Sequence, residues 1–300
     1  MHPLALSHLR LLPCFLAVGV SPLTAIQIAD FNTLTNDRFA NDDSFVANQF
    51  DLSGVALNGR PGWATMISEN VYITSEHYAP GVGSSMTFYA GNDPNGTSVT
   101  RQITSTRQQI QGTDIFVGTL DAGLPSGFSF YDFATEDISG AIVGSGSFSQ
   151  SSYSGANAYA FGRSPSSFPA SQDMAVGRNE LNRFFTVTDD EGNTGDAIAA
   201  TDDRETVDAV PFEAMLEDGD SGGPLFVENA EGGLTIVGTN WFVADADDDD
   251  VYDIFGASYL GNYDEDIQAF IDANPVPEPA AYALLLALAC GLAVQRRRRR

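Results

Sequence analysis

The residues best suited to chemistry lie in one short run, residues 219–224, which reads Gly-Asp-Ser-Gly-Gly-Pro. Glycines tolerate positive φ and let the backbone approach a ligand closely. The amides of Gly219 and Ser221 can therefore point at one place, where a carbonyl oxygen would gain negative charge. We expect Ser221 to be a nucleophile, these two amides to form an oxyanion hole, and Asp220 to be buried and to fix the loop.

A nucleophilic serine needs a base, and the chain offers few. It has three histidines, and His2 and His8 fall in the N-terminal export signal described below, which leaves His77. His77 follows, after two intervening residues, a β-branched and aromatic run, residues 71–74, which we predict to be a strand. The alternative is a structural histidine at a strand end.

The 219–224 run resembles the nucleophile signature of the trypsin/chymotrypsin-like serine proteases, with all six residues in the same order. That family also has a histidine just after a strand, which residues 73–78 match, and an aspartate that opens a strand, which residues 113–120 match. The resemblance implies a triad in the order His77, Asp114, Ser221, separated by 37 and 107 residues. Ser221 would attack a carbonyl carbon, His77 would accept its proton, and Asp114 would hold the imidazole.

The base of the family's specificity pocket lies six residues before the nucleophile, and Met215 stands there. An aspartate at this place would select lysine or arginine, so cleavage after basic residues is not expected unless Glu217 or Asp218 reaches inward. Met215 is thus a candidate substrate-binding residue.

Residues 240–242 resemble the family's Ser-Trp-Gly segment, which lines the pocket and pairs with substrate backbone. Asn240, Trp241 and Phe242 are therefore candidate substrate-binding residues. Phe242 replaces a glycine and would narrow the pocket, which favours small or medium apolar side chains. A cysteine after the family's histidine is replaced by Tyr78, so the expected fold lacks that bridge.

The N-terminal end predicts export. Residues 1–25 have a short polar start with Arg10, an apolar run at 11–20 and small residues at 23–25, as a secretory signal requires. Cleavage after Ala25 would expose Ile26. In many members of the resembled family, a freed N-terminal isoleucine or valine pairs with the aspartate before the nucleophile, here Asp220.

The C-terminal end, residues 276–300, resembles the PEP-CTERM sorting signal of Gram-negative bacteria. It combines Pro-Glu-Pro at 277–279, an apolar segment at 280–294 and five arginines at 296–300. The resemblance implies handling by an exosortase and delivery to the cell surface or extracellular matrix, with transient anchoring through this segment as a transmembrane helix. A plain membrane anchor is the alternative, although 15 residues are short for a span.

The composition of the region between the two end segments limits the classes of molecule that the protein can bind. Residues 26–275 hold 8 arginines, no lysine and 39 acidic residues, a formal charge of −31. Such a surface repels nucleic acid and anionic lipid, so we expect membrane contact only through the C-terminal segment. Cys14 and Cys290 lie in the end segments, so no disulfide is expected.

Many short strands separated by Gly, Pro, Asn and Asp clusters indicate an all-β fold, with helical periodicity only at 264–273. With the resemblance, we predict two antiparallel Greek-key β-barrels of chymotrypsin-like type and a short C-terminal helix. We assign 26–130 to the N-terminal barrel with a leader segment and 131–275 to the C-terminal barrel and helix.

Six aspartates crowd the segment from Asp245 to Asp253. Dense carboxylates suit Ca²⁺, but the glycine and distal glutamate of an EF-type loop are absent. We favour a solvated acidic loop over a calcium site and expect no required cofactor and no catalytic metal.

We therefore predict an exported serine endopeptidase that acts on protein or peptide substrates through an acyl-enzyme. Two alternatives remain. One is a catalytically idle surface or matrix protein that keeps the protease fold for binding. The other is an esterase using the same serine, which the order of the three residues disfavours.

Overall fold

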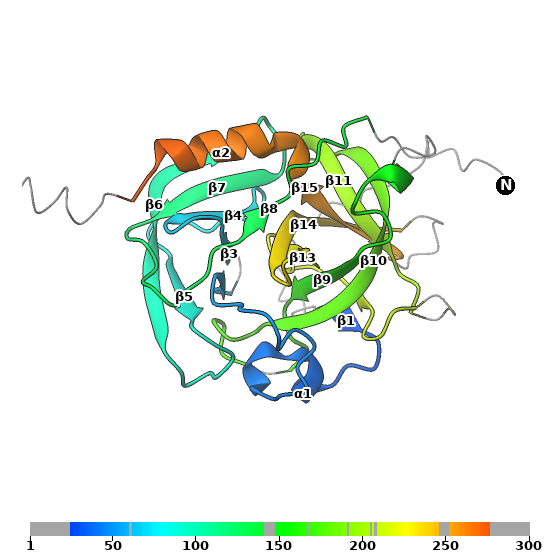
Figure 1. Ribbon diagram of the computed structural model, residues 1–300, viewed down its shortest axis with the longest axis horizontal. Coiled ribbons are helices and arrows are strands. Elements are labelled where there is room, and N and C mark those ends of the chain that lie inside the picture. The colour runs from blue at the N-terminus through cyan, green and yellow to red at the C-terminus, as the bar shows by residue number, and fades with distance from the viewer. Residues whose placement is uncertain are drawn as a thin grey trace, which may run out of the picture.

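The computed structural model describes residues 25–59, 62–140, 148–166, 168–190, 192–204, 206, 209–245 and 252–276. The export signal and nearly all of the sorting segment lie outside these ranges. Within them the chain is mostly β-strand and forms two units side by side, with helix α2 (Asp264–Ala273) across one end (Figure 1). The predicted helix at 264–273 is thereby confirmed.

The first unit is a six-stranded antiparallel sheet with the order β2-β3-β4-β7-β6-β5. The outer strands β2 and β5 lie against each other, so the sheet curls into a barrel. Its strands are β2 (Val55–Leu57), β3 (Trp63–Met66), β4 (Val71–Ser75), β5 (Ser85–Tyr89), β6 (Ser98–Gln109) and β7 (Ile115–Leu120).

The second unit has the order β13-β9-β10-β11-β15-β14, and a further pairing of β13 with β14 closes the ring. β8 (Asp132–Phe133) adds to β14 in parallel. The ring strands are β9 (Asn157–Gly162), β10 (Ala175–Thr188), β11 (Thr194–Thr201), β13 (Pro224–Glu228), β14 (Leu234–Ala244) and β15 (Ile254–Tyr259).

The two units share one topology. If each set of six strands is numbered along the chain, both follow the order 1-2-3-6-5-4, although the sequence shows no convincing repeat. This order is the paired Greek-key barrel arrangement of the chymotrypsin-like fold. The predicted fold class is confirmed.

Burial along the strands follows from this packing. Every residue of β4 is buried, because one face of β4 lines its own barrel and the other faces the second barrel. Tyr72 belongs to the core of the first unit. Val71 and Ile73 pack in the core between the units, together with Phe161 and Phe226 of the second unit. The strands that meet at this interface therefore have no polar face.

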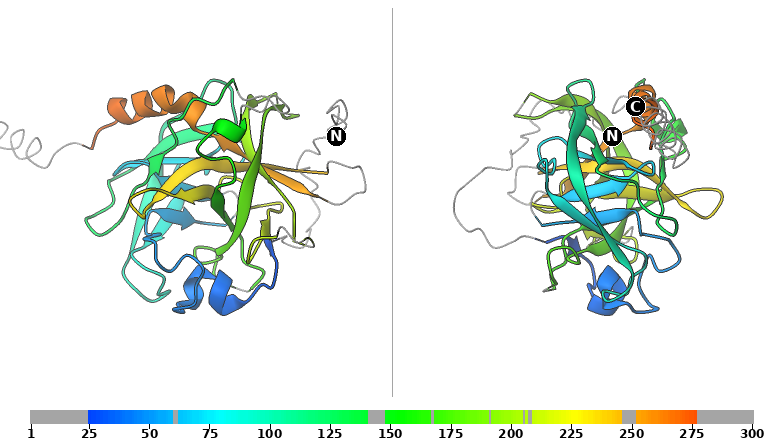
Figure 2. Two further views of the ribbon diagram at one scale, coloured as in Figure 1. Left: turned by 45° about the vertical axis from the view of Figure 1, so that its right-hand side comes forward. Right: turned by 90° about the vertical axis from the view of Figure 1, so that its left-hand side faces the viewer.

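The N-terminal segment, expected as a leader or edge segment, is built into the fold. β1 (Gln27–Ile28) pairs with β12 (Ala214–Met215), and α1 (Thr33–Asn36) and η1 (Arg38–Ala40) follow. Figure 2 shows α1 at the end of the molecule opposite α2. The fully buried Arg38 guanidinium donates to the carbonyls of Val55 and Tyr89 at 3.1 Å each. The segment is thus fastened to the first barrel.

Candidate active site

His77 and Asp114 lie just beyond the ends of two paired strands. β4 ends at Ser75 and β7 begins at Ile115, and these two residues are direct partners in the antiparallel ladder. The sequence pattern placed both side chains at strand ends, and the strand pairing brings those ends together.

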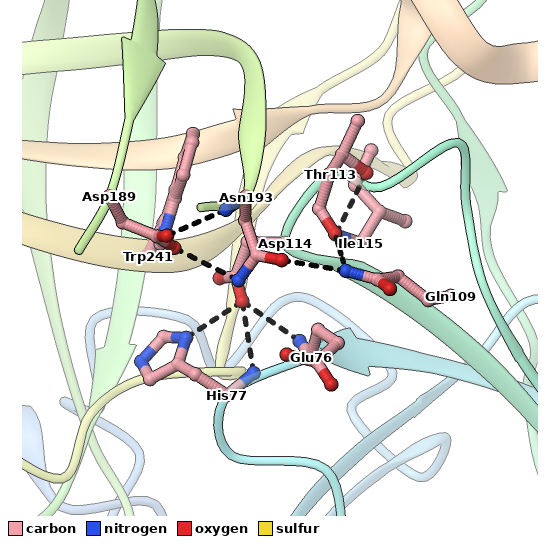
Figure 3. Close-up of polar contacts among 9 residues, drawn as sticks. All are labelled: Glu76, His77, Gln109, Thr113, Asp114, Ile115, Asp189, Asn193 and Trp241. Atoms are coloured by element: carbon pink, nitrogen blue, oxygen red, sulfur yellow. Dashed lines mark hydrogen bonds and ion pairs between the residues drawn. The ribbon is translucent and has the colours of Figure 1, made fainter. Parts of the chain in front are cut away.

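The Asp114 carboxylate organises this corner (Figure 3). Its Oδ1 accepts the His77 ring Nδ1 at 2.8 Å and the backbone amides of Glu76 and His77 at 3.0 Å each. The Glu76 amide also donates to the Asp114 carbonyl at 2.8 Å. Because Nδ1 donates its proton to a carboxylate, Nε2 is the imidazole nitrogen left to act as a base.

Burial shapes the electrostatics of the pair. The Asp114 side chain is fully buried and that of His77 is 11% exposed. Burial raises the pKa of Asp114, the hydrogen bonds and charge of His77 lower it, and the negative charge of Asp189 raises it again, with a net upward shift. Among the described residues no donor reaches Asp114 Oδ2.

Ser221 lies in a tight turn between β12 and β13. Gly219 and Gly222 have φ of 100° and 82°, values that favour glycine. The Gly222 amide donates to the Asn240 carbonyl at 2.8 Å, and the Asn240 amide donates to the Gly223 carbonyl at 2.8 Å. The turn is thereby fastened to β14 through the two residues that follow the serine.

Asp220 is buried beneath this turn, as expected from the sequence. Its Oδ1 accepts the Arg163 amide at 2.6 Å and its Oδ2 accepts the Glu217 amide at 2.9 Å. Burial raises the pKa of Asp220 to about 8, although the two amides act in the opposite direction. The Asn240 side chain supports the same loop through the Asp220 carbonyl at 3.1 Å and the Phe161 carbonyl at 2.7 Å.

The amides proposed to form the oxyanion hole differ from the neighbouring amides in their hydrogen bonding. Gly222 and Gly223 both donate to backbone carbonyls. In the part of the chain that the structure describes, no backbone acceptor pairs with the amide of Gly219 or Ser221. Two unengaged amides flanking Asp220 are what an oxyanion hole requires.

Gly222 joins the serine turn to the histidine corner. A Cβ added at Gly222 would lie 2.4 Å from Thr74 Oγ1 and 3.2 Å from the Ser75 amide nitrogen. Ser221 is the preceding residue, and His77 follows Ser75 by two residues. The close approach therefore brings the serine turn of the second barrel to the end of β4 that carries His77.

The four candidate substrate-binding residues have different surroundings. Met215 is almost fully buried in β12, opposite Gln27. The side chain of Asn240 is buried and engaged with the serine turn. Trp241 donates its indole N–H to Asp189 Oδ2 at 3.2 Å. The Phe242 ring packs on Gly256, where an added Cβ would lie 2.3 Å from Phe242 Cζ.

Asp189 lies in the hairpin that connects β10 to β11, and the sequence analysis did not identify its contacts. The Asn193 side chain in this hairpin accepts a hydrogen bond from the side-chain amide of Gln109, which also donates to the Thr113 carbonyl. The sequence signal here is the Gly192-Asn193 pair, which is typical of a turn.

No metal site is evident in the described ranges, where no three His, Cys, Asp or Glu side chains are placed to hold an ion. Residues 246–251, most of the acidic loop that suggested Ca²⁺, lie outside those ranges. Within the same ranges no helix has the length and apolarity to cross a bilayer. The predicted anchor at 280–294 lies outside them.

Comparison with known proteins gives distant structural likeness only. No family model and no curated protein matches the chain. Solved structures similar to it include the NS6 protease of murine norovirus 1, with 13% identity, 68% of this chain and 88% of that chain covered, and a TM-score of 0.39. An inactive mutant of the same protease with a C-terminal extension has 12% identity, the same coverage and a TM-score of 0.39. Likeness this low supports no conclusion about chemistry.

Proposed function

We propose that the protein is a serine endopeptidase that hydrolyses peptide bonds through an acyl-enzyme. Ser221 Oγ attacks the carbonyl carbon of the substrate, and its proton passes to His77 Nε2. Asp114 holds the imidazole and stabilises its cation. The amides of Gly219 and Ser221 stabilise the oxyanion. His77 then returns the proton to the leaving amine, and water releases the acyl group by the same route.

One observation carries this proposal, the contact of Gly222 with Thr74 and Ser75. It brings a glycine-rich serine turn with two unengaged amides to a buried carboxylate–histidine pair. A binding protein on the same fold would need neither the hydrogen bond from His77 to Asp114 nor open amides beside a serine. The geometry therefore supports catalysis over the idle binding protein.

The proposal extends to substrate and location. Met215 at the expected pocket base and the Phe242 ring over Gly256 favour small or medium apolar side chains over basic ones. Export, exosortase handling and delivery to the surface or matrix of a Gram-negative bacterium follow from the two end segments of the sequence. They are proposed on that ground alone.

Covalent labelling with a fluorophosphonate, read by intact mass, tests the activity. The parent protein should gain one adduct, and Ser221→Ala and His77→Gln should gain none. Ser126→Ala, which removes an exposed serine hydroxyl elsewhere, should label like the parent. Absence of labelling in a folded parent whose N-terminus has been freed at Ile26 would favour the binding-protein alternative.

A further inference from the structure

The hairpin between β10 and β11 reaches from the second barrel to the turn that carries Asp114. The Thr194 amide donates to the Gly112 carbonyl at 3.1 Å. The Gln109 side-chain amide donates to Asn193 Oδ1 at 2.7 Å and to the Thr113 carbonyl at 2.9 Å. The hairpin tip is therefore fixed to the residue immediately before Asp114.

Asp189 is the charged group that this hairpin brings to the site. Its Oδ1 accepts the Asn193 amide at 2.8 Å, and its Oδ2 accepts the Asn193 side chain at 3.0 Å and the Trp241 indole at 3.2 Å. All three donors are neutral. Within the described residues no arginine forms an ion pair with Asp189.

The charge of Asp189 reaches the catalytic corner. Burial is the largest cause of the raised pKa of Asp114, and the negative charge of Asp189 raises it further. Figure 3 shows the contacts from Trp241 through Asp189 and Asn193 next to the Asp114–His77 pair. Two further ionisable residues, Glu76 and Tyr78, flank His77 on its own loop, and the centres of the Tyr78 and His77 rings lie 5.1 Å apart.

Arg107, on β6, is held against the loop that follows His77 and, within the described residues, pairs with no carboxylate. It donates to the Pro80 carbonyl at 3.1 Å, and its guanidinium lies 5.6 Å from the centre of the Phe116 ring. The Asp114 carboxylate that pairs with His77 therefore has a second carboxylate, that of Asp189 from a separate loop, within electrostatic reach.

We propose that Asp189 is a positioning residue for the His77–Asp114 pair: it fixes the Trp241 indole and adds a second negative charge that stabilises the protonated imidazole. The inference rests on the proposed function, because the imidazole gains its proton when Ser221 attacks. A negative charge near a histidine favours the protonated ring. Asp189 thus sets the pH at which His77 becomes available as a base.

The chain offers a direct measurement. In the full chain carrying His2→Gln and His8→Gln, His77 is the single histidine, so its imidazole C–H signals can be followed by NMR against pH. The variants are Asp189→Asn, whose single amide oxygen can still accept from Trp241 and the Asn193 side chain but which loses the charge and the acceptor for the Asn193 amide, and Asp189→Ala, which removes the charge and every acceptor. Asp190→Asn makes the same charge change at the adjacent exposed position.

We expect Asp189→Asn to move the His77 midpoint to lower pH by about half a unit or more, since neutralising a nearby charge removes Coulomb stabilisation of the cation. Asp190→Asn should move it much less, because solvent screens an exposed charge. The pH of half-maximal fluorophosphonate labelling should move with the NMR midpoint. Equal midpoints in Asp189→Asn and Asp190→Asn would overturn the inference.

The two readouts separate this inference from the proposed function. If the parent does not label even with its N-terminus freed at Ile26, but the midpoint moves in Asp189→Asn, the function fails and the coupling stands. If the parent labels and the midpoint does not move, the function stands and the role of Asp189 is wrong. Should Asp189→Ala fail to fold, the isosteric Asp189→Asn still decides the question.

Discussion

The side chain of Ile26 lies beside the carboxylate of Asp220, in the space that Gly162 leaves by having no side chain. Ile26 Cβ and Asp220 Oδ2 each lie 2.7 Å from the position that a Cβ of Gly162 would occupy. The Ile26 amide donates to the Arg163 carbonyl at 3.1 Å, and the Arg163 amide donates to Asp220 Oδ1 at 2.6 Å. These contacts place Ile26 next to the carboxylate beneath the serine turn, and we expect a free α-amino group there to pair with it.

This arrangement predicts that a free Ile26 terminus increases activity. A buried carboxylate is costly without a partner, and an ammonium group would supply one. A chain that begins at Ile26 should label with fluorophosphonate about tenfold faster than the same chain with Ala25 retained, which corresponds to about 1.4 kcal/mol. Equal labelling rates would mean that the turn forms without the terminus. An Ile26 chain with Asp220→Asn should lose the advantage.

A second prediction concerns stability against pH when the Ala25–Ile26 bond is intact. Burial raises the pKa of Asp220 to about 8, above the value of about 4 in an unfolded chain. A raised pKa means that the folded state holds the proton more tightly. The contribution of Asp220 to stability is therefore fully present below pH 4 and is lost as the pH rises toward 8.

The free energy of unfolding of the intact parent, relative to Asp220→Asn, should fall on the order of 1 kcal/mol per pH unit across this window. Urea unfolding at several pH values measures it. Asp93→Asn, which neutralises an exposed aspartate, controls for net charge. The free energy of unfolding of the parent relative to Asp93→Asn should be nearly constant with pH. A difference for Asp220→Asn that rises with pH would show that the carboxylate is charged and stabilised when buried.

The contact that joins the two halves of the site predicts a third result. Gly222→Ala would place a Cβ 2.4 Å from Thr74 Oγ1 and at a positive φ, which costs a side chain about 1–2 kcal/mol. The serine turn should move away from β4, so labelling should fall by about a hundredfold or more, as when a catalytic donor is lost.

Gly83→Ala is the matched control, because Gly83 has φ of 80° and nothing within 4 Å of its added Cβ. Gly83→Ala should lower the temperature of thermal unfolding, because it too places a side chain at positive φ. It should react with the fluorophosphonate at the same rate as the parent. If both variants label equally well, the approach of Gly222 to Thr74 is not needed to assemble the site.

Much of this fold was predictable from local sequence, and the failures have physical reasons. Strands buried on both faces, such as β4 and β7, are rich in β-branched and aromatic residues and were recognised. β6 was missed because its side chains are mostly polar and exposed. β11 was missed because its buried face consists largely of alanine, which carries little strand signal.

Some residues of the candidate site could also be predicted from local sequence, and others could not. His77, Asp114 and Ser221 each stand in a short pattern with its own turn or strand signal, so each could be named in advance. Asp189 could not, because its contact with Trp241 spans 52 residues and its approach to Asp114 depends on how this hairpin of the second barrel docks on the first. The buried position of Ile26 likewise depends on the pairing of β1 with β12.

The last prediction concerns substrate choice and rests on Phe242. This residue pairs with Gly256 across β14 and β15, and its ring occupies the face that the missing side chain of Gly256 leaves open. It also contacts Phe185, with ring centres 6.1 Å apart. The ring lies beside that of Trp241, with ring centres 5.7 Å apart, and under the proposed pocket assignment it fills space that a substrate side chain would otherwise use.

Phe242→Gly should therefore open this space to larger residues. With peptides that differ only in the residue before the cleaved bond, kcat/KM for phenylalanine relative to alanine should rise about tenfold, as expected when a hydrophobic pocket gains room for a larger group. Phe130→Gly, at an exposed phenylalanine, should leave the ratio unchanged. An unchanged ratio in Phe242→Gly, with labelling intact, would mean that the substrate side chain binds elsewhere, and Met215 would then be the next residue to replace.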